Sequence, residues 1–182
     1  MSVFEFAFSL FGLLLGLSLA EVLGGFARSV EARKWARLGW LTPLLAIFVI
    51  VDVVSFWASA WLLRDQIAFS LQFMLGSAAF AGAYYVGAYL VFPRSLEQQK
   101  DLDIHYLTIR RPVLGIVATA NFVQFLLFLR IVGWEGLGGP WELARFAAFE
   151  LLCVANMFTR GRRIMPVALA VLVTFYIVDL LT

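Results

Sequence analysis

Apolar residues run through the chain in six long blocks, and the short segments between the blocks hold most of the charged residues. The blocks cover residues 4–27, 42–63, 67–92, 112–133, 140–159 and 164–182. A helix that crosses the hydrocarbon core of a bilayer needs about 20 mainly apolar residues. The pattern therefore predicts an all-α integral membrane protein, a compact six-helix transmembrane bundle that forms one domain over residues 1–182 without a soluble domain.

The five prolines support these boundaries. Pro43, Pro112, Pro140 and Pro166 fall where a first helical turn would begin, and Pro93 follows the third block. Proline is tolerated in a first turn because the N–H that it lacks would have no partner within the helix. We therefore expect no proline to interrupt a span. Five spans remain the alternative, if residues 140–182 formed one re-entrant unit, but RGRR at 160–163 favours a turn at the membrane surface.

Composition agrees with a membrane protein. Hydrophobic residues make up 63% of the 182 residues and charged residues 14%, whereas soluble domains are about 45–50% apolar and about 25% charged. The net charge of +2 does not indicate a nucleic-acid partner, because the basic residues gather in short connections between apolar blocks. The lipid bilayer is the expected partner.

Lysine and arginine placement predicts the orientation, because cytoplasmic loops are enriched in these residues. The odd-numbered connections hold 11 of the 14 basic residues, namely Arg28, Arg33, Lys34, Arg37, Arg94, Lys100, Arg110, Arg111, Arg160, Arg162 and Arg163. We therefore expect both termini on the outer side of the membrane and the basic connections in the cytoplasm. The membrane is expected to be the cytoplasmic (inner) membrane of a bacterium. The N-terminal sequence MSVFEF does not resemble a cleaved signal peptide. The basic loops can contact anionic lipids. The longest loop, 94–111, contains His105 and is expected to lie along the membrane surface or to contact a partner.

Small residues recur every four positions in the first block, at Gly12, Gly16, Ala20 and Gly24. This spacing lets two helix backbones approach closely. The third block, 67–92, is also rich in glycine and alanine. We expect these two helices to pack tightly, either on each other or on copies in a homo-oligomer or a larger membrane complex.

One carboxylate, Asp52, lies near the middle of the second block. An aspartate at the centre of a span costs about 2.5–3.5 kcal/mol on insertion scales. Thirteen Leu, Ile, Phe and Val residues between 41 and 63 return roughly 4–8 kcal/mol on the same scale. The helix can therefore insert with Asp52, but insertion does not explain why the aspartate is there.

The fifth block is more polar. It contains Glu142, Arg145 and Glu150, and only seven Leu, Phe and Val residues. It should insert poorly alone and lie at the centre of the bundle. Glu150 falls at nearly the depth of Asp52, counted at about 1.5 Å per residue. Ionisable residues in spans commonly mark ion paths or proton relays. The residues predicted for such a path are Asp52, Glu150, Glu21, Asn121, Gln124 and Ser55.

Other charges fit a structural role. Glu142 and Arg145 are three residues apart and can pair on one helix face. Arg130 and Asp179 both fall in the outer half of their spans and are expected to form a second pair. The same structural interpretation applies to Asp52 and Glu150 as an alternative, since buried polar groups can simply hold helices together.

Several activities are excluded by the residues present. Cys153 and His105 are the only cysteine and histidine, so the sequence offers no disulfide, no multi-histidine metal site and no haem ligand pair. Both lysines lie in loops, which excludes a Schiff-base cofactor within the bundle, and no cofactor motif is present. The first hypothesis is a small channel or transporter for protons or another cation. The alternative is a non-catalytic membrane module, such as a sensor, assembly factor or accessory subunit, and an enzyme acting on lipid comes third.

Overall fold

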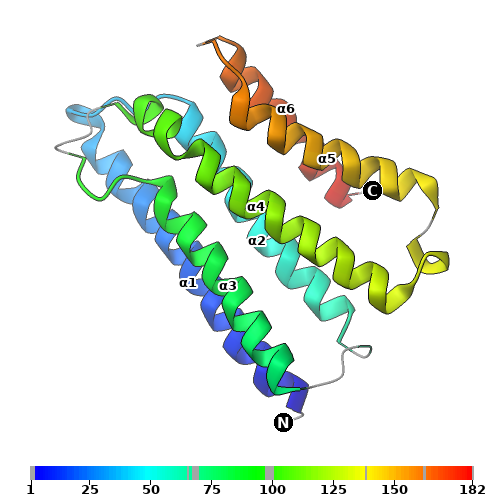
Figure 1. Ribbon diagram of the computed structural model, residues 1–182. Helices are drawn as coiled ribbons and strands as arrows, with labels where there is room; N and C mark the ends of the chain where they lie inside the picture. The colour runs from blue at the N-terminus through cyan, green and yellow to red at the C-terminus, as the bar shows by residue number, and fades with distance from the viewer. Residues whose placement is uncertain are drawn as a thin grey trace. The chain divides into compact units, whose positions relative to one another are not determined.

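In the computed structural model, which describes residues 3–64, 66, 70–96, 101–137, 139–161 and 163–181, the chain forms six α-helices. They are α1 (Val3–Glu31), α2 (Leu41–Leu62), α3 (Leu71–Val91), α4 (Leu102–Val132), α5 (Pro140–Phe158) and α6 (Ile164–Leu181) (Figure 1). Short 3₁₀ turns follow α1 at Ala32–Lys34 and α4 at Glu135–Leu137. No strand occurs within the described ranges, so the all-α expectation is confirmed.

Four helices, α1 to α4, are long and apolar enough to cross a membrane. In α6, the segment Ile164–Val178 is apolar but shorter. The helix α5 carries Glu142, Arg145 and Glu150, and it is the most polar of the predicted spans. The apolar character of the helices is that of a membrane protein.

The fourth helix begins ten residues earlier than the sequence pattern predicts. It starts at Leu102, so Pro112 lies inside it and not in its first turn. Asp101 accounts for the early start, because its Oδ1 accepts a hydrogen bond from the backbone N–H of Asp103 at 2.9 Å and so caps the helix. The expected surface loop over 94–111 is therefore wrong for residues 102–111, and Arg110 and Arg111 belong to a helix. The other prolines lie as expected, in or next to first turns or just after α3.

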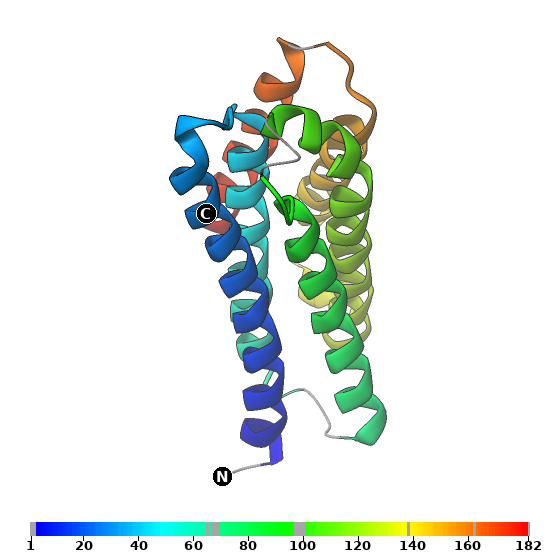
Figure 2. The same ribbon diagram turned by 90° about the vertical axis from the view of Figure 1, so that its left-hand side faces the viewer.

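The contacts divide the chain into two compact units, Met1–Ile109 and Arg110–Thr182. Each unit is described by itself, and the single domain stays a prediction. In the first unit, α1 packs most extensively against α3 and also contacts α2. Figures 1 and 2 show α1 and α3 side by side over most of their length.

The buried face of α1 differs from the predicted glycine ladder. It consists of Phe11, Leu15, Ser18, Val22, Gly25 and Ser29, which recur at intervals of three and four. Gly16 is exposed, and a methyl group added there would meet nothing within 4 Å. The closest approach is instead at Gly25, where an added Cβ would lie 2.5–2.7 Å from atoms of Phe92. The tight packing of α1 on α3 thus includes large side chains, with glycine needed at one point.

Aromatic side chains join α1, α2 and α3 in the first unit. The ring of Phe56 lies 4.3 Å from Phe80 and 5.3 Å from Phe11, measured between centroids. Phe8 contacts Trp57 and Trp61 one turn further along. Such ring pairs contribute about 0.5–1.5 kcal/mol each beyond their buried area. They therefore stabilise the packing of α2 against α1 and α3.

A polar junction ties the loop between α1 and α2 to the start of α4. The Oδ1 atom of Asp103 accepts hydrogen bonds from the backbone N–H groups of Trp40 and Leu41, at 3.1 and 3.0 Å. These are N–H groups at the beginning of α2, where a negative charge is favoured by the helix dipole. Thr42 donates to the carbonyl of Leu102 at 2.7 Å. The junction fixes the start of α2 against the start of α4.

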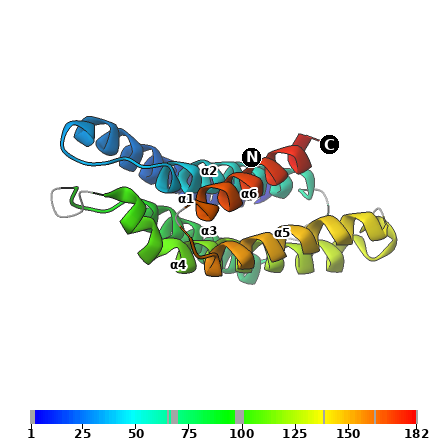
Figure 3. The same cartoon turned by 90° about the horizontal axis from the view of Figure 1, so that it is seen from above.

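The second unit contains the remainder of α4 together with α5 and α6. Phe125 of α4 stacks on Phe146 of α5 at 4.0 Å, and Phe149 of α5 contacts Tyr176 of α6 at 4.9 Å. Figure 3 shows α5 leading through a short turn into α6. Asn156, only 2% exposed, donates from Nδ2 to the carbonyl of Ala168 and links α5 to α6.

Candidate functional site

Asp52 lies near the middle of α2 and is completely buried, with 0% of its surface exposed. It belongs to the buried face of that helix, which also includes Leu45, Phe48 and Val49, three to seven residues before it. An ionised carboxylate in an apolar interior is costly unless it is paired or neutralised. Asp52 therefore occupies a position where the state of its carboxyl group has a large influence on stability.

Phe56 indicates which helices this side of α2 faces. It follows Asp52 by four residues and so lies one turn further on the same face. Its ring contacts Phe11 of α1 and both Phe80 and Tyr84 of α3, the last at 5.5 Å. The Asp52 face of α2 is therefore directed toward α1 and α3 within the first unit.

The serines that follow Asp52 are partly accounted for within their own helix. Ser59 donates from Oγ to the carbonyl of Ser55 at 2.9 Å. Both residues are half-buried. A back-bonded hydroxyl of this kind satisfies its donor locally, and it still offers a lone pair to a neighbour.

Glu150 of α5 is half-buried, and its carboxylate oxygen Oε1 is enclosed. The residues beside it on α5, Phe149 and Cys153, are buried. Asp52 and Glu150 belong to different compact units, so the prediction that the two carboxylates meet stays a prediction.

The two amides expected near the middle of α4 are both half-buried. Asn121 donates from Nδ2 to the carbonyl of Val117 at 3.1 Å, within its own helix. Gln124 lies about one turn further along α4. The role of Asn121 and Gln124 in an ion path stays a prediction.

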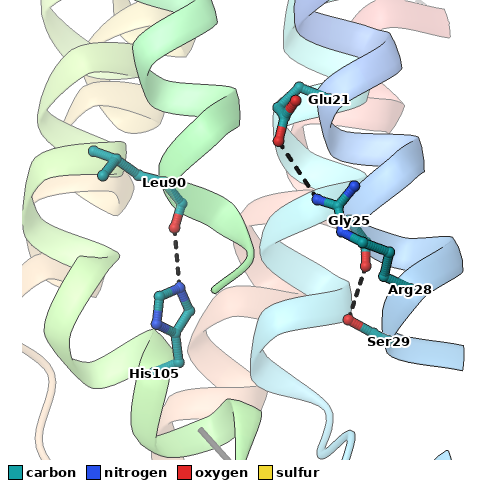
Figure 4. A network of polar contacts seen from close by, with 6 residues as sticks. All are labelled: Glu21, Gly25, Arg28, Ser29, Leu90 and His105. Atoms are coloured by element: carbon teal, nitrogen blue, oxygen red, sulfur yellow. Dashed lines mark hydrogen bonds and ion pairs between the residues drawn. The ribbon is translucent and has the colours of Figure 1, made fainter. Parts of the chain in front are cut away.

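Glu21 forms an ion pair with Arg28 on α1, with Oε1 and Nη2 3.5 Å apart (Figure 4). The side chains are 29% and 50% exposed, respectively, which places the pair at the surface of the first unit. Exposed pairs contribute little to stability, about 0–1 kcal/mol. Pairing gives Glu21 a structural role, and its place in an ion path stays a prediction.

The two expected structural ion pairs have different outcomes. Arg145 donates from Nη1 to Oε1 of Glu142 at 3.1 Å, on one face of α5. Arg130 is exposed near the end of α4. The side chain of Asp179 lies outside the described residues, so the pairing of Arg130 with Asp179 stays a prediction.

Two polar side chains make contacts that were not anticipated. Arg110 is 8% exposed and donates from Nη1 to the carbonyl of Thr159 and to the sulfur of Met165. The Nε2 atom of His105 lies 3.1 Å from the carbonyl of Leu90, so this histidine joins α4 to the end of α3 (Figure 4). The sequence DLD at 101–103 could have revealed the helix start that positions both residues, because aspartate is a favoured N-cap.

No group of three or more His, Cys, Asp or Glu residues within the described residues is arranged to hold a metal ion. A cavity of about 10 Å³ lies between α1 and α3, lined by Leu10, Phe11, Met74, Ser77 and Ala78. That volume is close to the minimum needed for a single water molecule. The candidate site is the carboxyl group of Asp52, which is buried on α2.

No protein-family model, no curated protein and no solved structure matches the chain.

Proposed function

We propose that this chain is an integral membrane protein that moves protons or another cation along a path that includes Asp52. The observation that carries the proposal is the complete burial of this aspartate in the middle of an apolar helix. Ionisable side chains in spans are costly and usually mark the binding point of an ion or proton. A single carboxyl group can serve by taking up a proton on one side and releasing it on the other.

The proposed placement follows the sequence pattern. All six helices cross the cytoplasmic membrane of a bacterium, with both termini outside and the basic connections inside. Support comes from the four long apolar helices and from the distribution of arginine and lysine. In this arrangement α5 is shielded by other helices or by a second copy, because its charged residues suit it poorly to lipid. Glu150 is proposed as a second carboxyl group on the path, at the depth of Asp52.

Proton movement can be measured in liposomes that contain the purified protein and a trapped pH-sensitive dye. We expect Asp52→Asn to reduce the flux at least tenfold, because the amide occupies nearly the same volume and cannot release a proton. The matched control is Glu142→Gln, which removes a carboxylate that is paired with Arg145 and should leave the flux within twofold. Equal flux from Asp52→Asn and wild type, in folded protein, would remove Asp52 from the path.

A non-catalytic membrane module is the second candidate. The exposed basic side chains of Arg33, Lys34 and Arg37 favour it, because they offer a charged surface that a partner can contact. In that case liposomes should show no flux above that of empty vesicles, and a partner protein should co-purify in mild detergent. Co-purification of a stoichiometric partner together with absent flux would replace transport by this role.

A further inference from the structure

We propose that the turn between α5 and α6 binds the phosphate of an anionic phospholipid. The turn carries Arg160 and Arg163, both exposed, between the end of α5 and the beginning of α6. Arg110 and Arg111 of α4 contact the residues on either side of it. Four described arginines therefore gather at one place in the second unit.

Arg110 holds this region in a fixed shape. Its guanidinium group is buried and donates to the Thr159 carbonyl, at the end of α5, and to Met165, in the first turn of α6. A cation is favoured at the C-terminus of a helix by the partial negative charge there. Arg110 thus joins three helices at this end of the unit, and the neighbouring arginines extend from a rigid base.

Arg111 provides a second, more exposed guanidinium group. Its Cζ atom lies 5.2 Å from the centre of the Phe158 ring. The cation–π attraction favours this position of the guanidinium group, and because Arg111 is exposed, its N–H groups can reach a ligand. Arginine forks of this type bind phosphate oxygens through paired hydrogen bonds.

The acidic residues described in the second unit lie away from this turn. Glu135 lies in the 3₁₀ turn before α5 and Glu142 in the first turn of α5, at the opposite end of that helix. Glu150 precedes Phe158 by eight residues, which corresponds to about 12 Å along a helix. The arginines therefore repel one another, and an anion bound among them would relieve that repulsion. This is an electrostatic reason for an anionic ligand.

The apolar surface beside the arginines favours a lipid as the source of the phosphate. Phe158 and Ile164 are 59% and 60% exposed, and they flank the turn on α5 and α6. A headgroup phosphate among the arginines would place its acyl chains along these side chains. Free phosphate would use the arginines alone. The site therefore fits an amphipathic ligand, in the leaflet where anionic lipids attract basic segments.

This inference uses the membrane placement proposed above but does not depend on transport through Asp52. The test is native mass spectrometry of the intact protein in neutral detergent, with short-chain phosphatidylglycerol, short-chain phosphatidylcholine or inorganic phosphate added. We expect phosphatidylglycerol to bind at least tenfold more tightly than phosphatidylcholine, and inorganic phosphate to leave that binding unchanged. The double variant Arg160→Gln/Arg163→Gln should lose at least tenfold in affinity for phosphatidylglycerol.

The matched control is Arg64→Gln/Arg130→Gln, which removes the same charge just after α2 and near the end of α4, outside the basic connections. It should change the affinity less than twofold. Equal losses in the two double variants would overturn the site, because net charge alone would then explain binding. If inorganic phosphate displaced phosphatidylglycerol when both are present at the same concentration, the ligand would be a phosphate and not a lipid. Treatment of membranes with alkaline carbonate is a separate test of the membrane placement. Release of the wild-type protein would overturn that placement and the lipid site with it.

Discussion

Replacement of Gly39 by alanine should destabilise the protein through two effects that can be separated. Gly39 has φ of +64°, in the left-handed region, where the presence of a Cβ costs roughly 1–2 kcal/mol. An added Cβ would also overlap the carboxylate of Asp103. Since that carboxylate accepts two N–H groups at the start of α2, its displacement should cost about 2 kcal/mol, the upper end for an N-cap.

The expected cost of Gly39→Ala is therefore about 3–4 kcal/mol, the sum of backbone strain and cap loss. Asp103→Ala alone should cost about 2 kcal/mol, because it removes the same cap. With both changes present, the carboxylate is absent and only the strain of a non-glycine residue at position 39 is added, so the total should again be about 3–4 kcal/mol. The double variant should thus be about 2 kcal/mol more stable than the sum of the single variants predicts, which is the mark of two residues in contact.

Gly133 supplies the control for the backbone effect. Its φ is +75°, and a Cβ added there would meet nothing within 4 Å. Gly133→Ala should consequently cost only the strain of about 1–2 kcal/mol. The free energy of unfolding can be measured in mild detergent by titration with a denaturing detergent. Additive effects of the Gly39 and Asp103 changes, or equal costs at Gly39 and Gly133, would refute the proposed junction.

Two further predictions concern packing and a buried cation. Gly25→Ala should lower the free energy of unfolding by about 1–3 kcal/mol, because the new methyl group would overpack against Phe92. The control Gly16→Ala, on the same helix, should be neutral or slightly stabilising. Equal effects of the two changes would contradict the close approach of α1 to Phe92. Arg110→Ala should cost about 2–3 kcal/mol of stability through loss of its charged hydrogen bond to Thr159. The control Arg130→Ala, at an exposed site, should cost less than about 0.5 kcal/mol. Thermal unfolding in detergent compares the two variants, and similar midpoints would contradict a structural role for Arg110.

Hydrophobic blocks predicted the helices well wherever a block ended in turn-forming residues. Pro140 marks the beginning of α5, and Pro93 follows the end of α3. The start of α4 was misjudged because charged residues at 101–111 interrupt the apolar pattern and Pro112 resembles a first-turn proline. The N-cap at Asp101 was the better signal, since a cap specifies a helix start whatever the polarity of the turn that follows.

Residues that meet through tertiary structure were harder to predict. Burial of Asp52 could be anticipated, because a carboxyl group in an apolar span is disfavoured on the lipid side. The buried face of α1 could not, since Phe11, Leu15 and Val22 look as suited to lipid as to protein, and the glycine pattern suggested a neighbouring face. The contact of Asp103 with Gly39 joins positions 64 residues apart, and no local pattern indicates it.

The junction at Asp103 also has a consequence for the exposed basic side chains of the first connection. The backbone there is anchored by the helical turn at Ala32–Lys34 and by the bonds from Trp40 and Leu41 to Asp103. Arg33, Lys34 and Arg37 therefore project from a scaffold that is already ordered before any encounter. A molecule that meets them has to restrain only the side chains, so the entropic penalty of association is smaller than for an unstructured basic tail.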